Sequence, residues 1–346
     1  MSKPALLYIS INDGSDTRIN KEIQTLATRF EVYYIGIGKS KEKAFVQRYC
    51  KYFQIVEGHH KSAVSLFKFY LLFLRLYFAH SFEAIHVINE QLLLIFYPFL
   101  FFRKKKIVLD IFDSIFLRSG RQMEWLKNLT YHLPSVILVT DNNRKSLMPA
   151  KFQHKIIVVE NYPYKYTGNV AKSDNTDKLV IFYNGSMSKA RGTDMLQGLL
   201  HLSPATVVKM AGWIYDQETK ELSLHPQVNY LGVVTQQESM KVASECDYIL
   251  SVYEPKNENN INASPNKIYD AIQAQTPVII NREVKIADFV AKQRIGYVTD
   301  SFYTLNYEQL LHDLIRLKGS FTFSPALQHT YTWEAIEYKL LQAHKQ

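Results

Sequence analysis

The chain has 346 residues, enough for two globular domains of about 150 residues each, and an apolar fraction of 47% excludes wholesale disorder. Its two cysteines, Cys50 and Cys246, lie far apart, which excludes a disulfide framework or a cysteine zinc site and fits a reducing cytoplasm. A formal charge of +9 favours anionic partners: nucleic acid, an acidic membrane surface or phosphorylated small molecules.

Strand and helix patterns alternate through the first half of the chain. The N-terminal residues lead directly into a strand, which predicts no signal peptide. Strands are predicted at 5–10, 31–38, 84–89, 105–113, 135–140 and 155–161, and a helix at 17–29. Such an alternation predicts a parallel sheet covered by helices. The polar, turn-rich stretch 162–178 then predicts a linker.

A second α/β series follows the linker. Strands are predicted at 178–185, 205–213, 226–233 and 247–253, and helices at 190–202 and 235–246. Two such domains form a cleft between the carboxyl ends of their strands, where ligands normally bind. We expect an N-terminal domain at 1–165, a C-terminal domain at 166–325 and a final helical segment at 326–346.

Two apolar, aromatic stretches, 63–80 and 92–106, contain basic residues. A helix across a bilayer needs roughly 20 apolar residues without central charges, and Lys68 and Arg75 interrupt the first stretch, so no span is predicted. The second ends in the basic run 103–106. Two interpretations remain open: an interfacial helix on an anionic membrane, or a buried helix with a solvated basic end.

The stretch YNGSMSKARG (183–192) predicts an anion-binding loop. We expect the strand to end at Asn184-Gly185, where glycine permits a tight turn, and a helix to follow with free N–H groups. Arg191, at the helix entry, can bind two phosphate oxygens. The alternative is an ordinary exposed arginine on a helix.

The stretch SPNKIYD (264–270) predicts a second loop of this kind. Ser264 is predicted as the N-cap and Pro265 as the first helical residue. Lys267 then lies in the first turn, where the helix dipole disfavours a cation unless an anion neutralises it. Asp270 shares its face, so that lysine can bind phosphate and aspartate can bind ribose hydroxyls. The alternative is a surface ion pair.

Together these motifs resemble the bacterial glycosyltransferases of the GT-B fold in the large group 1 family (glycosyltransferase family 4). The resemblance implies an α/β fold of two Rossmann-like domains facing a central cleft, with a C-terminal helix that crosses back to the N-terminal domain. It rests on SDTRINKEIQTLATRFEVYYIG (15–36), NGSMSKARG (184–192), VNYLGVVTQQESMKVASECDYILSVY (228–253), PNKIYDAIQAQTPVI (265–279) and YTWEAIEYKLL (331–341).

For the second domain, the resemblance implies that Arg191 and Lys267 hold the donor diphosphate and that Asp270 binds the ribose. Asn262 stands where the family has a glutamate for the donor sugar, which leaves the sugar open. Gln275 replaces a family glycine and predicts a changed turn. The donor-binding candidates are Gly185, Ser186, Asn262, Ser264, Pro265, Asn266 and Asp270.

For the first domain, the resemblance implies transfer with retention of configuration. Asp113 follows Phe112, where the family often has histidine, and it is the candidate base if the enzyme inverts instead. The acceptor-side candidates, each of which equally suits a loop or a helix cap, are Gly14, Asp16, Arg18 and Glu90.

The function expected is transfer of a hexose from a nucleotide-diphosphate sugar, taken to be a UDP-sugar, to a lipid-linked or saccharide acceptor in bacterial cell-surface polysaccharide synthesis. We expect no metal or other cofactor, and a cytoplasmic protein that is peripheral on the inner membrane face. Two alternatives remain: a nucleotide-sugar epimerase of the same fold, and a basic membrane- or nucleic-acid-binding protein. We expect no nucleic-acid partner, because the cations coincide with helix starts rather than with one stripe.

Overall fold

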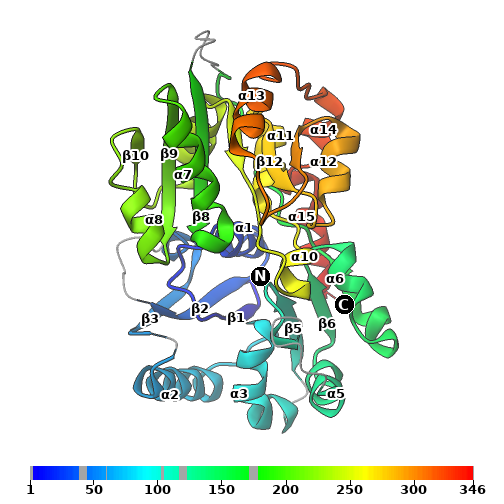
Figure 1. The fold of residues 1–346 in the computed structure, drawn as a ribbon. Coiled ribbons are helices and arrows are strands. Elements are labelled where there is room, and N and C mark those ends of the chain that lie inside the picture. The colour runs from blue at the N-terminus through cyan, green and yellow to red at the C-terminus, as the bar shows by residue number, and fades with distance from the viewer. Residues whose placement is uncertain are drawn as a thin grey trace. The chain divides into compact units, whose positions relative to one another are not determined.

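The computed structural model describes residues 3–38, 45–59, 61–102, 105–116, 123–170 and 178–345. The chain forms two compact units (Figure 1): unit 1 comprises Met1–Asn161 and Ile336–Gln346, and unit 2 comprises Tyr162–Ala335. Part of the predicted basic run, Arg103 and Lys104, and residues 171–177 of the predicted linker lie outside the described residues.

Unit 1 is built on a parallel sheet whose described strands have the order β3-β2-β1-β4-β5-β6-β7. The predicted parallel α/β architecture is thus confirmed. The order reverses between β1 and β4, the kind of switch point at which α/β sheets place their sites. Sequence patterns missed the edge strand β3, whose residues YFQIVE mix polar and apolar types. The bounds are β1 Ala5–Ile9, β2 Glu31–Gly38, β3 Tyr52–Glu57, β4 Ala84–Ile88, β5 Lys106–Ile111, β6 Val136–Val139 and β7 Ile156–Val158.

Helices cover this sheet, and one of them arrives from the far end of the chain. The helix α15 starts in unit 2 and belongs to unit 1 from Ile336 on. It contacts α1 through Thr25, whose Oγ1 donates to Glu337 Oε2 at 2.6 Å, as the predicted crossing back of the C-terminal helix requires. The bounds are α1 Thr17–Leu26, α2 Ala63–Ala79, α3 Asn89–Phe102, α5 Glu124–His132, α6 Asn142–Ser146 and α15 Trp333–Lys345.

The apolar helix α2 has two different faces. Phe69, Phe73 and Leu76 pack in the core of unit 1, so this helix is part of the fold. Its opposite face leaves Val64 and Phe67 more than half exposed. Among the described helices, none combines the length and the hydropathy that crossing a bilayer would take.

Unit 2 has a second parallel sheet, with the order β10-β9-β8-β11-β12-β13 among the described strands. The strands are β8 Leu179–Met187, β9 Thr206–Ile214, β10 Val228–Tyr230, β11 Tyr248–Leu250, β12 Val278–Asn281 and β13 Gly296–Thr299. The helices are α7 Thr193–Leu202, α8 Gln217–Leu222, α9 Gln236–Ser244, α10 Glu258–Ile261, α11 Asn266–Ala274, α12 Ala287–Gln293, α13 Tyr307–Arg316 and α14 Pro325–Thr330.

Candidate functional site

The first part of the predicted anion-binding loop, residues 183–187, lies within the strand β8 rather than after it. The prediction that the strand ends at Gly185 is wrong, because β8 pairs with β9 as far as Met187. Glycine is nevertheless required, since Gly185 has φ 82°, a conformation that a Cβ atom disfavours. It lies opposite Gly212, where an added Cβ would be 2.1 Å from the Gly185 carbonyl oxygen. At position 212 the two backbones therefore approach too closely for any residue larger than glycine.

A short 3-10 turn, Lys189–Arg191, leads from β8 into α7. The Arg191 Cζ atom lies 3.5 Å from the centroid of the Tyr253 ring, a cation–π contact. The Arg191 Nη1 atom is buried and has no hydrogen-bond partner within the part of the chain that the structure describes. A buried donor without an acceptor is costly, so this guanidinium suits a ligand that brings acceptor oxygens.

The second predicted loop leads into α11. This helix begins at Asn266, and Pro265 is its extended N-cap, so the prediction of Ser264 as N-cap is wrong by one residue. The Ser264 hydroxyl is 2.7 Å from the hydroxyl of Tyr269 instead. At the other end, Gln275 takes the left-handed conformation with φ 51° that a glycine would take. The predicted change of turn is therefore wrong, and the side chain costs about 1 kcal/mol there.

Lys267, in the first turn of α11, is only 9% exposed and donates from Nζ to the carbonyl oxygen of Leu250 at 3.1 Å. A Cβ atom placed on Gly185 would lie 3.8 Å from the Lys267 Cε atom. The N–H of Glu254 donates to the Ala190 carbonyl at 3.0 Å and joins the loop after β11 to the 3-10 turn. The structure thus brings the two predicted loops together at the carboxyl ends of β8 and β11.

The charges at this place favour an anion. Burial and the positive charge of Arg191 together lower the pKa of Lys267 to about 7, although Asp270 opposes the shift. Two neighbouring cations repel each other until a negative ligand separates them. Because Lys267 is buried, the alternative of a surface ion pair between Lys267 and Asp270 does not describe it.

Asn262 lies at the C-cap of α10 and is fully buried. Its Nδ2 donates to the backbone carbonyl and to the Oε2 atom of Glu258, both at 2.8 Å. Its Oδ1 is buried without a partner among the described residues. Asn262 can therefore only accept a hydrogen bond from a ligand. Of the other donor-binding candidates, Ser186 is exposed and Asn266 is half-buried.

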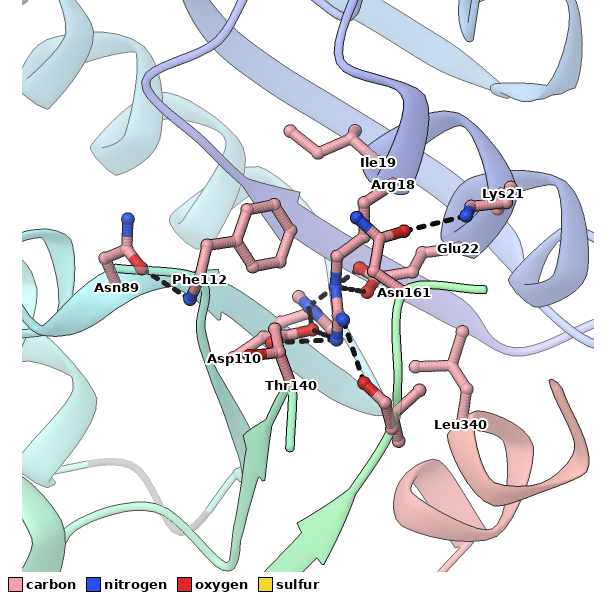
Figure 2. A network of polar contacts seen from close by, with 12 residues as sticks. Arg18, Ile19, Lys21, Glu22, Asn89, Asp110, Phe112, Thr140, Asn161 and Leu340 are labelled. Carbon is pink, nitrogen blue, oxygen red and sulfur yellow. Dashed lines mark hydrogen bonds and ion pairs between the residues drawn. The ribbon is translucent and has the colours of Figure 1, made fainter. Parts of the chain in front are cut away.

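In unit 1, Arg18 lies at the centre of a buried polar network (Figure 2). Its Nε donates to Glu22 Oε1 at 2.7 Å, its Nη2 to both oxygens of Asp110 at 3.1 and 3.2 Å, and its Nη1 to the carbonyl of Val159 at 2.8 Å. Asp16 caps α1 by accepting from the N–H groups of Arg18 and Ile19. These bonds give Arg18 and Asp16 a structural role. That either residue contacts the sugar acceptor stays a prediction.

The two other acceptor-side candidates also have defined positions. Gly14 adopts φ 87° in the loop before α1, and its N–H donates to Asn12 Oδ1 at 2.8 Å. Glu90 is fully buried at the start of α3. Asp113, after β5, differs from both because its side chain is 48% exposed.

Four members of the buried network, Tyr8, Glu22, His86 and His344, were not predicted from the sequence. Tyr8 donates to Glu22 Oε2 at 2.6 Å, and His86 stacks between the rings of Tyr8 and His344. The histidine inside the apolar run AIHVI could have indicated this network from the sequence, since a buried polar group in such a strand needs hydrogen-bond partners.

Among the described residues, Glu22, His86 and Asp110 form a candidate set of metal ligands. Each offers one ligand atom, and these atoms lie within 4.8 Å of one another. The Arg18 guanidinium already bonds both carboxylates and neutralises much of their charge. A divalent cation there would lie beside this guanidinium, so the set fits a buried ion-pair network better than a metal site.

No family model and no curated protein matches the sequence. Solved structures match it over nearly its whole length. Sucrose-phosphate synthase from Thermosynechococcus elongatus superposes with a TM-score of 0.70 at 12% identity, over 99% of this chain and 98% of that one. HepE from Anabaena in complex with UDP gives 0.69 at 11% identity, over 99% of both chains. The lipopolysaccharide outer core galactosyltransferase WaaB gives 0.64 at 14% identity, over 98% of both. The chain therefore has the GT-B fold, as predicted.

Proposed function

From this GT-B fold we propose that the protein is a glycosyltransferase that takes a hexose from a nucleotide-diphosphate sugar, most simply a UDP-sugar. The observation that carries the proposal is the pair of cations, Arg191 and Lys267, beside Gly185, with the Arg191 Nη1 atom buried and without a hydrogen-bond partner among the described residues. The solved structures of HepE with UDP and with UDP-glucose support this donor class.

The cations have a direct chemical role in this reaction. As the glycosidic bond breaks, negative charge grows on the departing diphosphate, and Arg191 and Lys267 stabilise it without a metal. Asp270 binds the ribose hydroxyls, and Asn262 accepts from a hydroxyl of the donor sugar. We propose retention of configuration, with the Asp113 carboxylate in contact with the acceptor hydroxyl; if the enzyme inverts instead, Asp113 is also the base that takes the proton of that hydroxyl.

We further propose a lipid-linked or saccharide acceptor, in bacterial cell-surface polysaccharide synthesis, and peripheral binding of unit 1 to an anionic membrane. The helices α2, α3 and α5 lie next to one another along unit 1 (Figure 1). Lys68 and Arg75 are exposed on α2 between apolar side chains, an arrangement suited to anionic lipid. Exposed large apolar side chains on these helices include Val64, Phe67, Leu71, Phe78, Phe101, Phe102 and Trp125.

Calorimetric titration with UDP and UDP-glucose tests the donor site. R191A and K267A are each expected to weaken UDP binding about tenfold or more, because each loses a charge-assisted hydrogen bond. K189A is the matched control, since Lys189 is an exposed lysine of the same turn, paired with Asp194 at 3.5 Å. Unchanged affinity in both R191A and K267A would show that the donor binds elsewhere.

Turnover without an acceptor separates this proposal from an epimerase. The protein is incubated with a UDP-sugar alone, and the sugar nucleotide is analysed by chromatography. A transferase leaves the sugar nucleotide unchanged or slowly hydrolyses it, whereas rapid formation of an epimer would contradict the proposal.

A further inference from the structure

Two consecutive residues at the start of α3 hold the segment that follows β5, residues 112–115. Asn89 Oδ1 accepts the N–H of Phe112 at 2.8 Å and that of Asp113 at 3.1 Å; Figure 2 shows the first of these bonds. Glu90 accepts the hydroxyl of Ser114 at 2.7 Å and the N–H of Ile115 at 3.3 Å. Each residue of the segment therefore donates a hydrogen bond to Asn89 or Glu90.

Asn89, which accepts these two N–H groups, has a strained backbone conformation. Asn89 has φ 61°, one of three positive φ values among the described non-glycine residues. A left-handed conformation is unfavourable for a side chain with a Cβ atom, and asparagine tolerates it better than most residues. Strain of this kind persists where the surrounding contacts enforce it, and it is concentrated at functional sites.

Glu90 has an unusual environment for a carboxyl group. It is fully buried, and a third donor, the Tyr131 hydroxyl, lies 3.0 Å from its Oε1 atom. Burial raises the pKa of Glu90, although the hydrogen bonds from Ser114, Tyr131 and Ile115 oppose the shift. Burying a carboxyl group costs free energy, and here the compensating bonds run mainly to one short segment.

Arg144 holds the same segment from α6. Its Nη1 donates to the Phe112 carbonyl, and its Nη2 lies 3.8 Å from Asp113 Oδ1. Ser114 is only 1% exposed and Phe112 is half-buried, while the Asp113 side chain is 48% exposed. The result is a fixed backbone that carries a partly exposed carboxylate beside Arg144, and a fixed backbone is what a preorganised reactive group requires.

We infer that Asn89 and Glu90 are positioning residues, which hold the Asp113 carboxylate in place for the sugar transfer. The catalytic part of this inference rests on the proposed function, whereas the holding of residues 112–115 does not. Asn89 acts through the backbone of Asp113 and does not itself touch the substrate. It is the better residue to test, because Glu90 substitutions also disturb Tyr131 in the core.

The first measurement is amide hydrogen exchange at Phe112 and Asp113. N89A removes the acceptor, N89G removes the acceptor together with the backbone strain, and N89D keeps an acceptor oxygen in place. We expect exchange at both amides to accelerate about tenfold or more in N89A and N89G and to stay near the wild-type rate in N89D. R294G is the matched control, because Arg294 has the similar φ of 55° at the end of α12 in unit 2. Unchanged exchange in N89A and N89G would overturn the inference.

The second measurement is the slow hydrolysis of UDP-glucose in the absence of an acceptor, with UDP affinity recorded in parallel. N89A is expected to lower kcat about tenfold or more with UDP affinity unchanged, N89D to restore most of the rate, and R294G to match the wild type. If Asn89 acts through Asp113, the N89A/D113N double variant loses no more than D113N alone. Additive losses would overturn the catalytic part.

The two measurements distinguish failure of this inference from failure of the proposed function. A wild-type protein that neither binds UDP nor turns over UDP-glucose contradicts the proposed function and the catalytic part together. The exchange rates still decide in that case whether Asn89 holds residues 112–115.

Discussion

The Nδ1 atom of His86, on β4, lies 3.1 Å from the Nε2 atom of His344, on α15, so one of these two nitrogens donates a hydrogen bond to the other. The Nδ1 atom of His344 lies 2.8 Å from the Leu340 carbonyl, which only accepts, so this nitrogen carries a proton. In neutral His344 the Nε2 atom is then the acceptor, and His86 Nδ1 is the donor. Neutral His86 therefore turns a bare Nε2 toward Glu22 Oε2 and Asp110 Oδ2, each 3.6 Å away.

A bare nitrogen facing two carboxylates is repulsive, so one further proton belongs among these three groups. Burial and the charge of Asp110 raise the pKa of Glu22. Burial alone would raise the pKa of Asp110 as well, but the positive charge of Arg18 holds it well below its usual range. Glu22 is therefore the group we expect to be protonated at neutral pH.

This assignment predicts different costs for two similar substitutions. E22Q replaces a neutral acid by a neutral amide and is expected to lower the free energy of unfolding by about 1 kcal/mol or less. D110N removes the charge that pairs with buried Arg18 and is expected to cost about 3–5 kcal/mol. Urea denaturation at pH 7 measures both, and equal losses in the two variants would contradict the assignment.

Stability is expected to fall in acid through His344. Burial, together with His86, lowers the pKa of His344 from its ordinary 6.5 to about 3. The unfolded chain binds a proton in that interval and the folded one does not, so this stabilisation is complete above the higher value and is lost as the pH falls. One such group contributes a slope of about 1.4 kcal/mol per pH unit. Denaturation between pH 4 and pH 7 should show a shallower slope in H344Q than in the wild type, and an unchanged slope would contradict this role of His344.

Binding of UDP is expected to take up a proton at Lys267. Its pKa of about 7, lowered by burial and by Arg191, leaves it mostly neutral at pH 8. A bound diphosphate favours the charged ammonium, so binding at pH 8 should take up nearly one proton, and uptake should vanish near pH 6. Calorimetry in buffers of different ionisation enthalpy measures this number. K267R cannot lose its charge and should show no uptake, and equal uptake in K267R would assign the proton to another group.

Membrane binding is expected to depend on charge as well as on apolar contact. Vesicles with anionic lipid should sediment the protein, and neutral vesicles should do so weakly. K68E and R75E are each expected to weaken binding about fivefold or more, because losing a basic residue near an anionic surface costs about 1 kcal/mol and the new carboxylate is repelled as well. K220E, on α8 of unit 2, provides an exposed control. Equal loss in K220E would indicate an effect of net charge rather than of this surface.

The architecture could be predicted because parallel strands are continuous apolar runs. Buried strands such as β4 and β5 are recognised from composition alone. The edge strand β3 could not be recognised in this way, since one of its sides has no partner among the described strands and its pattern mixes residue types. Helix starts were predicted less well: α11 begins at Asn266, one residue beyond the position that Ser264 and Pro265 indicate.

For the candidate site, individual residues could be predicted from local sequence, but their contacts with distant residues could not. Arg191 and Lys267 could be selected from the loops that carry them. Their proximity depends on β8 and β11 being neighbours in the sheet, which no local pattern states. Asn89 could not be selected at all, because its partners Phe112 and Asp113 lie on another strand's loop and its positive φ is a property of the folded chain.

The segment Tyr162–Ala335 is an insertion between the two parts of unit 1. During synthesis, β4 and α1 are made early, but the half of α15 that covers His86 and Thr25 is made only after all of unit 2. Protein domains generally fold as they leave the ribosome. Unit 2, although second in the chain, is therefore the first unit whose residues have all been synthesised. Until residues 336–346 are made, unit 1 lacks the part of α15 that covers its interior. The order of folding on the ribosome is expected to be the reverse of the order of the sequence.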